Sequence, residues 1–207
     1  GTGFIVDGNV IATAAHCVYS KGNASSYNCG LTIEKIIIFN TDGSTAKTIT
    51  NNVKEIHLPQ KYIDSGAGSN AYDYALITVG EDLSDYAIFN LGIMQNDFVK
   101  KSTNKIYTTG FPGIVKGNEV NTGEKHNAYT GSGEVCTYQY FDYSRQFCFD
   151  NDVSGGDSGE PVYVKTTFDG ETYYTVIGIT TAEAENCNVA NRISPTLLQF
   201  YKNNSNL

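Results

Sequence analysis

Three residues of this sequence have the types needed to hydrolyse an amide by nucleophilic attack. A serine attacks an amide when a base takes its proton, another group fixes the tautomer of that base, and N–H donors stabilise the oxyanion. Ser158 lies in a glycine-rich turn, 154–161, that precedes a β-forming run. Because glycines let backbone N–H groups converge on one point, this turn predicts a nucleophile together with its oxyanion site.

His16 and Asp73 are the candidates for the base and for the group that orients it. His16 follows the small residues 13–15 at the end of a predicted strand, where an imidazole could stand in a cleft without crowding. Asp73 opens an apolar run, where a buried carboxylate needs a partner such as His16. The chain order His, Asp, Ser is that of the chymotrypsin triad, and neither the subtilisin nor the α/β-hydrolase order.

The other two histidines lack such surroundings. His57 precedes a Leu-Pro pair, and His126 lies in a polar loop of Lys and Asn. We therefore predict that both are structural or solvated.

Short β-forming segments must position these residues. Asp7–Gly8 and the segment 168–171 are turn sequences that predict hairpins. The clearest helix signal is near the end of the chain, with Ser194 as its cap and Pro195 at its first position. The runs expected to form strands are 3–6, 9–12, 35–40, 75–79, 105–109, 133–140, 161–166 and 173–180. The pattern predicts an all-β protein, and periodicity alone leaves barrel and sandwich open.

Composition excludes several classes of function. The net charge is -8 and no Lys/Arg cluster occurs, so we expect no nucleic-acid partner. No apolar run is long enough to span a bilayer, so no membrane association is expected. The five cysteines lack the C-x-x-C spacing of zinc sites, which favours disulfides in a secreted, extracellular protein. No metal or organic cofactor is expected.

Three short blocks resemble the signatures of trypsin-like serine proteases. They read TAAHC at 13–17, DYALI at 73–77 and GDSGEP at 156–161. Within that clan, TTGFPG at 108–113 and YDYALITV at 72–79 are similar to bacterial glutamyl endopeptidases. These motifs carry the family resemblance, which composition and spacing do not show by themselves.

The resemblance implies two antiparallel six-stranded β-barrels, with the triad at their interface and the C-terminal helix packed on the second barrel. We expect a single peptidase domain, 1–207, with the first barrel over 1–95 and the second barrel and helix over 96–207. It also implies that an N-terminal strand is missing from the sequence, which would leave the first barrel with an exposed edge.

Carried over to this sequence, the resemblance makes Ser158 the nucleophile, His16 the base and Asp73 the orienting acid, with the N–H groups of Gly156 and Ser158 as the oxyanion hole. The expected protein is a secreted, monomeric serine endopeptidase that cleaves proteins or peptides through an acyl-enzyme. A non-catalytic module descended from a protease and a Gly-Asp-Ser esterase are the alternatives. The intact triad disfavours the first, and the position of the serine after the histidine disfavours the second.

The expected substrate pocket contains Asp152, Val153, Thr180, Thr181 and Glu183. Asp152 stands six residues before the nucleophile, where trypsin-like enzymes carry the acid that binds Lys or Arg. Glu183 at the rim would also favour a cation. Glutamyl endopeptidases bind glutamate with a histidine that would fall near Thr180, and this sequence has no histidine in that region. The specificity is therefore left open.

Asp157 is expected to hold the oxyanion turn through an ion pair. In trypsin-like zymogens the partner is a freed N-terminal amine, but Gly1 resembles a position well inside the first barrel. The partner is therefore either an N-terminus upstream of this sequence or a side chain such as Arg145 or Arg192.

The resemblance also guides the cysteine pairing. In this clan Cys17 pairs with a cysteine near the position of the first residue, which is glycine here. We therefore predict a bond from Cys17 to Cys29 and one from Cys136 to Cys148, with Cys187 left over. A bond between Cys148 and Cys187 near the substrate pocket is the alternative.

Overall fold

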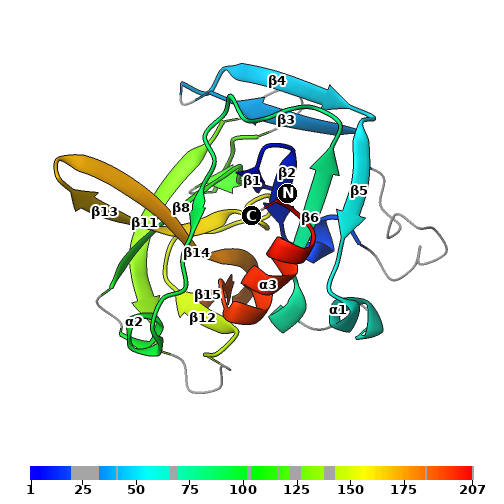
Figure 1. Ribbon diagram of the computed structural model, residues 1–207. Coiled ribbons are helices and arrows are strands. Elements are labelled where there is room, and N and C mark those ends of the chain that lie inside the picture. The colour runs from blue at the N-terminus through cyan, green and yellow to red at the C-terminus, as the bar shows by residue number, and fades with distance from the viewer. Residues whose placement is uncertain are drawn as a thin grey trace.

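The structure is a computed structural model of the chain, and it describes residues 1–19, 33–40, 42–65, 70–101, 104–115, 117–121, 127–137, 143–184 and 186–206. They form two β-sheet bodies with few and short helices (Figure 1). No helix in the described ranges is long and apolar enough to cross a membrane.

The N-terminal of the two β-sheet bodies contains six strands, counted over the described residues, in two sheets. The larger sheet is antiparallel in the order β1-β2-β6-β5. Its strands are β1 (Gly3–Asp7), β2 (Val10–Thr13), β6 (Ala75–Val79) and β5 (Val53–His57). A ribbon of β3 (Lys35–Phe39) and β4 (Thr45–Thr50) lies above it in Figure 1. The predicted hairpin at Asp7–Gly8 is confirmed as the β1–β2 connection.

The C-terminal half is a closed barrel. Its six strands follow the order β13-β8-β11-β12-β15-β14, and a further pairing of β13 with β14 closes the ring. They are β8 (Lys105–Gly110), β11 (Tyr129–Cys136), β12 (Gln146–Phe149), β13 (Pro161–Phe168), β14 (Glu171–Ala184) and β15 (Cys187–Arg192). The short strand β7 (Asn90–Leu91) pairs with β14 in parallel, and β9 (Ile114–Val115) pairs with β10 (Asn118–Glu119). This all-β architecture with a C-terminal helix is the expected fold.

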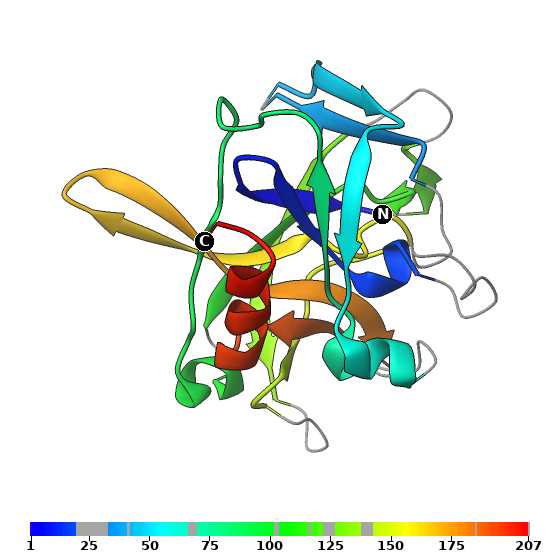
Figure 2. The same ribbon diagram turned by 45° about the vertical axis from the view of Figure 1, so that its right-hand side comes forward.

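The turn of the β13–β14 hairpin follows the local sequence. Asp169 and Gly170 both have positive φ, 50° and 83°, as a two-residue turn matched to the strand twist requires. The hairpin extends from the barrel as a long arm (Figure 2). Its predicted position at 168–171 is confirmed.

The helices are short, and two 3-10 turns adjoin the candidate site. The turn η1 (Ala15–Cys17) follows β2 and contains His16, and η3 (Asn70–Tyr72) precedes β6 and ends one residue before Asp73. The others are α1 (Gln60–Asp64), α2 (Asn96–Lys100) and α3 (Pro195–Asn203). α3 begins as predicted, because the Ser194 hydroxyl accepts the Leu197 N–H at 3.2 Å and Pro195 takes the first position.

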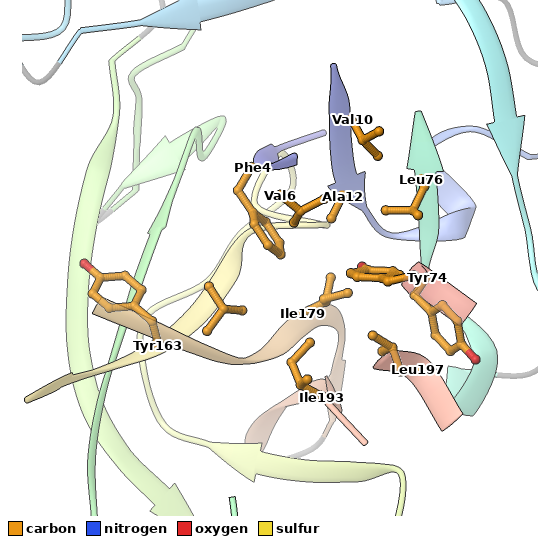
Figure 3. Packing of buried hydrophobic residues seen from close by; sticks show 12 residues of the cluster. Phe4, Val6, Val10, Ala12, Tyr74, Leu76, Tyr163, Ile179, Ile193 and Leu197 are labelled. Atoms are coloured by element: carbon orange, nitrogen blue, oxygen red, sulfur yellow. The ribbon is translucent and has the colours of Figure 1, made fainter. Parts of the chain in front are cut away.

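The two halves share a buried core. Leu197 and Tyr201 of α3 pack in a cluster with residues of β1, β2 and β6 and residues of β13 and β14 (Figure 3). The helix therefore packs on the second barrel, as expected, and on the first β-body as well. This cluster fixes the two β-bodies against each other, so strands from both can supply one site. The members of the cluster are Phe4, Val6, Val10, Ala12, Tyr74, Leu76, Tyr163, Val176, Ile179, Ile193, Leu197 and Tyr201.

Candidate active site

His16 is placed by a tight turn at the end of β2. Ala14 and Ala15 are fully buried, so the chain can turn sharply there without a large side chain in the way. The Cys17 N–H donates to the Ala14 carbonyl at 3.2 Å and closes the turn. The imidazole of His16 is left partly exposed.

Asp73 holds His16 with both carboxylate oxygens. Its Oδ2 lies 2.7 Å from His16 Nδ1, and its Oδ1 accepts the backbone N–H of His16 at 2.8 Å. Asn191 of β15 donates to the Asp73 carbonyl at 3.0 Å, so the second barrel fixes the backbone of this residue. Asp73 is only 3% exposed, and the two donors satisfy the buried carboxylate.

This contact sets the tautomer and the basicity of His16. Because Asp73 accepts at Nδ1, the proton of the neutral imidazole lies on Nδ1 and Nε2 is left as the acceptor. The hydrogen bond with Asp73 raises the pKa of His16 above its ordinary value, the neighbouring Cys17 adds to the rise, and burial opposes it. The ring is therefore arranged to take a proton at Nε2.

The turn around Ser158 depends on glycine at two positions. Gly156 has φ +111° and Gly159 has φ +91°, which L side chains rarely adopt. A β-carbon at Gly156 would lie 2.4 Å from the Phe111 carbonyl oxygen, and one at Gly159 would lie 2.2 Å from the Thr2 carbonyl oxygen. Both contacts are with backbone, so neither can relax by a side-chain rotation.

Two backbone N–H groups of this turn are available to a ligand. The N–H of Asp157 donates to the Ser154 carbonyl at 3.0 Å, and the N–H of Gly159 donates to the Thr180 carbonyl at 2.8 Å. The N–H groups of Gly156 and Ser158 donate to no acceptor in the described part of the chain. These are the two donors expected for the oxyanion hole.

The Ser158 segment adjoins the His16 segment. The Ser158 carbonyl accepts the Thr2 N–H at 2.8 Å and faces Cys17 Sγ at 3.4 Å. Among the described residues, no hydrogen bond joins the Ser158 hydroxyl to the His16 ring. Catalytic hydrogen bonds are often long without substrate and tighten in the complex.

A cleft of about 230 Å³ opens beside Ser158. This volume is below the range of about 300–1,000 Å³ typical of sites for whole small molecules, and it suits one side chain of a peptide. Among the described residues, Glu183 is the only charged member of the lining. The lining residues are Val153, Ser154, Gly155, Ser158, Thr180, Ala182 and Glu183.

The structure separates the five expected pocket residues into two groups. Val153, Thr180 and Glu183 line the cleft beside Ser158. Asp152 is exposed and is not part of the lining. Thr181 is also outside it, because its hydroxyl points to the Val189 carbonyl at 3.3 Å.

Three further lining residues, Ser154, Gly155 and Ala182, were missed at the level of sequence. They flank expected positions and reach the cleft through the local backbone of the turn and of β14. A residue-type pattern does not single out such small residues.

Neither arginine holds Asp157, although a side chain of this kind was one of the two expected partners. Arg192 donates to Asn96 Oδ1 at 2.5 Å and to the Tyr143 carbonyl at 2.7 Å. The guanidinium of Arg145 lies 4.7 Å from the centre of the Tyr72 ring. Both side chains are engaged elsewhere, and within the described ranges no ion pair reaches Asp157.

One predicted disulfide is wrong. Cys148 is bonded to Cys187, and Cys136 is a free thiol. Cys136 does lie opposite Cys148 on the neighbouring strand, but β12 has β15 on its other side. Cys148 is fully buried, and the more buried of its two neighbouring cysteines takes the bond. The alternative pairing is the one formed.

The remaining cysteine and histidine predictions have different outcomes. Cys17 has a free thiol in the structure, and Cys29, its expected partner, lies outside the described residues. His57 lies at the end of β5, 3.5 Å from Glu55 Oε2, and is not among the residues that line the cleft beside Ser158. His126 is also outside the described residues.

Comparison with known proteins identifies the class. The sequence profile of the Trypsin family matches residues 1–202, and the chain belongs to this family of serine endopeptidases. It is therefore a hydrolase that acts on peptide bonds.

A solved structure shows the same fold. It is described as "Structure of Glu endopeptidase in complex with MPD" and superimposes with a TM-score of 0.75 over 99% of this chain and 85% of that chain. At 18% sequence identity this likeness concerns the fold. No curated protein sequence matches significantly.

Proposed function

We propose that the protein is a secreted endopeptidase that cleaves peptide bonds through an acyl-enzyme on Ser158. His16 acts as the base, Asp73 orients it, and the N–H groups of Gly156 and Ser158 bind the oxyanion. The observation that carries the proposal is the two-point contact between the Asp73 carboxylate and His16. This contact leaves Nε2 free to accept a proton beside the turn that bears the serine.

The proposed reaction has two balanced halves. Ser158 Oγ attacks the substrate carbonyl while its proton passes to His16 Nε2, and the negative oxygen is stabilised by the two N–H groups. The C–N bond then breaks, and His16 gives the proton to the leaving amine. In the second half a water loses a proton to His16 and attacks the acyl carbonyl. The bond between the acyl carbon and Ser158 Oγ then breaks, His16 returns the proton to Ser158 Oγ, and the carboxylic acid product leaves.

The cleft beside Ser158 suggests a preference for Lys or Arg before the scissile bond. Glu183 brings a carboxylate to the cleft, and no Lys or Arg of the described residues lines it. Asp152, although outside the lining, lies close enough for its charge to act on Asp157. The negative field of these two groups attracts a basic side chain and repels glutamate.

The proposed setting is outside the cell, with the protein acting as a monomer on proteins or peptides. The bond between Cys148 and Cys187 is of a kind that persists in oxidising compartments. The net charge of -8 does not suit nucleic acid or an anionic membrane surface.

A fluorophosphonate probe tests the nucleophile. The wild-type chain should be labelled, and Ser158→Ala should abolish labelling. Ser44→Ala is the matched control, because Ser44 is an exposed serine outside the cleft, and its hydroxyl donates to Asp42 Oδ1 at 2.6 Å. Its labelling should persist. A folded wild-type chain that is never labelled would favour the non-catalytic module, and digestion of a mixed peptide library would show whether cuts follow Lys and Arg.

A further inference from the structure

Two acidic side chains are buried together beneath the oxyanion turn. Asp157 is 3% exposed and Glu160 is 2% exposed. Asp157 Oδ2 accepts the Ser154 N–H at 3.0 Å, and Glu160 Oε1 accepts the Thr180 hydroxyl at 3.2 Å. Thr108 also hydrogen-bonds the Glu160 carboxyl group. The proposed catalytic steps use neither side chain.

The other oxygen of each carboxyl group faces the same point. A β-carbon on Gly110 would lie 2.5 Å from Asp157 Oδ1 and 2.6 Å from Glu160 Oε2, so the two oxygens are no more than about 5 Å apart. Asp157 Oδ1 is buried and has no hydrogen-bond partner in the described part of the chain. An acceptor in this situation needs a donor.

The surroundings favour keeping one proton in this pair. Burial raises the pKa of Glu160 to about 9, and the charge of Asp157 adds to this, while hydrogen bonds from Thr180 and Thr108 oppose it. Two carboxylates that share a buried site do not both ionise easily. At neutral pH the Glu160 carboxyl is therefore neutral and has an O–H to donate.

Asp157 is the member of the pair that carries the charge. Burial raises its pKa to about 6, and the negative charges of Asp152 and Glu183 contribute to the rise. The hydrogen bond from the Ser154 N–H lowers it. At neutral pH Asp157 is thus largely ionised, while Glu160 still holds its proton.

We propose that Glu160 is a positioning residue for the oxyanion hole, whose neutral carboxyl donates a hydrogen bond from Oε2 to Asp157 Oδ1. This inference rests on the proposed function of the turn. The carboxyl–carboxylate pair holds Asp157 in place of the ion pair that was expected. Asp157 lies between Gly156 and Ser158, so a shift of its side chain moves both N–H donors.

The pair also predicts a limit at alkaline pH. When Glu160 loses its proton, near pH 9, two buried negative charges face each other and the hydrogen bond is lost. The turn then moves and kcat falls. The loss is reversible, because it needs only a proton.

Two substitutions of Glu160 distinguish its role as a hydrogen-bond donor from its ability to ionise. Glu160→Gln keeps a neutral donor for Asp157 and an acceptor for Thr180, so kcat should stay within about threefold of wild type at pH 7.5, and the fall near pH 9 should disappear. Glu160→Met keeps the approximate size and removes the donor, so kcat should fall about tenfold or more, with KM much less changed. Affinity for a peptide aldehyde, which forms an oxyanion on Ser158, should fall in parallel with kcat. Glu171→Gln, at the exposed start of β14, is the matched control and should behave as wild type.

The ionisation of Glu160 is measured without catalysis, by NMR of chains carrying carbon-13 in the glutamate carboxyl groups. One glutamate signal should titrate above about pH 8, disappear in Glu160→Gln, and move to lower pH in Asp157→Asn. A Glu160 signal that titrates near the ordinary glutamate range of about pH 4–5 would overturn the inference, as would a kcat in Glu160→Gln as low as in Glu160→Met. Failure of the proposed function is recognised separately, as a wild-type chain that shows this titration but does not react with the fluorophosphonate.

Discussion

Replacing Asp73 with asparagine tests how the carboxylate controls His16. Asparagine has the same shape, and its amide oxygen can keep the backbone N–H of His16 that Oδ1 accepts at 2.8 Å. Its NH₂ group then faces His16 Nδ1, where Oδ2 accepts at 2.7 Å in the native chain. The ring must place its proton on Nε2, so it can no longer accept the proton of Ser158.

The size of the effect follows from these two contacts. Loss of a hydrogen bond to a charged group costs at most about 3 kcal/mol, which corresponds to about two orders of magnitude in rate. The wrong tautomer removes the base itself, and the combined loss in kcat should approach about 10⁴-fold at neutral pH. The pKa of His16, which Asp73 raises, should fall towards its ordinary value. The new asparagine side chain stays buried and hydrogen-bonded, so folding should be retained.

The assay is kcat for a peptide amide together with the rate of fluorophosphonate labelling, measured across pH. Asp82→Asn is the matched control, because Asp82 also accepts a backbone N–H, that of Ser84 at 2.9 Å, but lies on the exposed surface away from the site. It should keep wild-type rates. The reasoning is refuted if the Asp73→Asn variant is folded and its kcat stays within about tenfold of this control, or if NMR shows an unchanged His16 pKa.

Four further predictions concern the turn, the cleft, the first barrel and pH. Gly156→Ala places a methyl group 2.4 Å from a backbone carbonyl oxygen, so kcat should fall about 100-fold or more, and a wild-type kcat would contradict the need for glycine. Glu183→Gln should lower kcat/KM for Lys and Arg substrates about two- to fivefold, as for an exposed charge, without lowering it for uncharged ones. Gly1→Cys should form a disulfide with Cys17, because the two β-carbons would lie 3.2 Å apart, slightly closer than the usual disulfide separation of about 3.5–4.5 Å, so that a small shift of the chain allows the bond. Closing a loop of about 15 residues should add up to about 3 kcal/mol to the free energy of unfolding in urea. Reductant should remove this increment, and Gly1→Ser should lack it. Native Glu160 holds its proton up to about pH 9, whereas the unfolded chain loses it near pH 4.5. The free energy of unfolding should therefore fall as the pH rises between these limits, by at most about 1.4 kcal/mol per pH unit from this group. This slope should decrease in Glu160→Gln.

Short-range features were accessible from the sequence because their causes are local. The Asp169–Gly170 turn follows from residues that tolerate the positive φ it requires, and the hairpin at Asp7–Gly8 follows from a turn dipeptide between two β-forming runs. The start of α3 follows from Ser194 and Pro195. The turn around Ser158 was recognised because its glycines are needed for backbone conformation.

The strand β15 escaped prediction because two of its polar residues are hydrogen-bonded by distant parts of the chain. Asn191 and Arg192 of β15 are both buried, which an alternating apolar pattern does not suggest. Asn191 donates to the Asp73 carbonyl, 118 positions away in the sequence. The partner of Cys148 likewise depended on which strand lies on each side of β12.

The family, the candidate triad and the local turns could be inferred from the amino-acid sequence, since each depends on residue types within a few positions. Which side chains meet could be seen only once the chain was folded. Folding brings Asp73 against His16 across 57 positions, gives Cys148 its partner, leaves Asp152 outside the cleft, and turns Asp157 and Glu160 towards Gly110. Such contacts depend on strand register and on how the two β-bodies pack, and neither is encoded in any short segment.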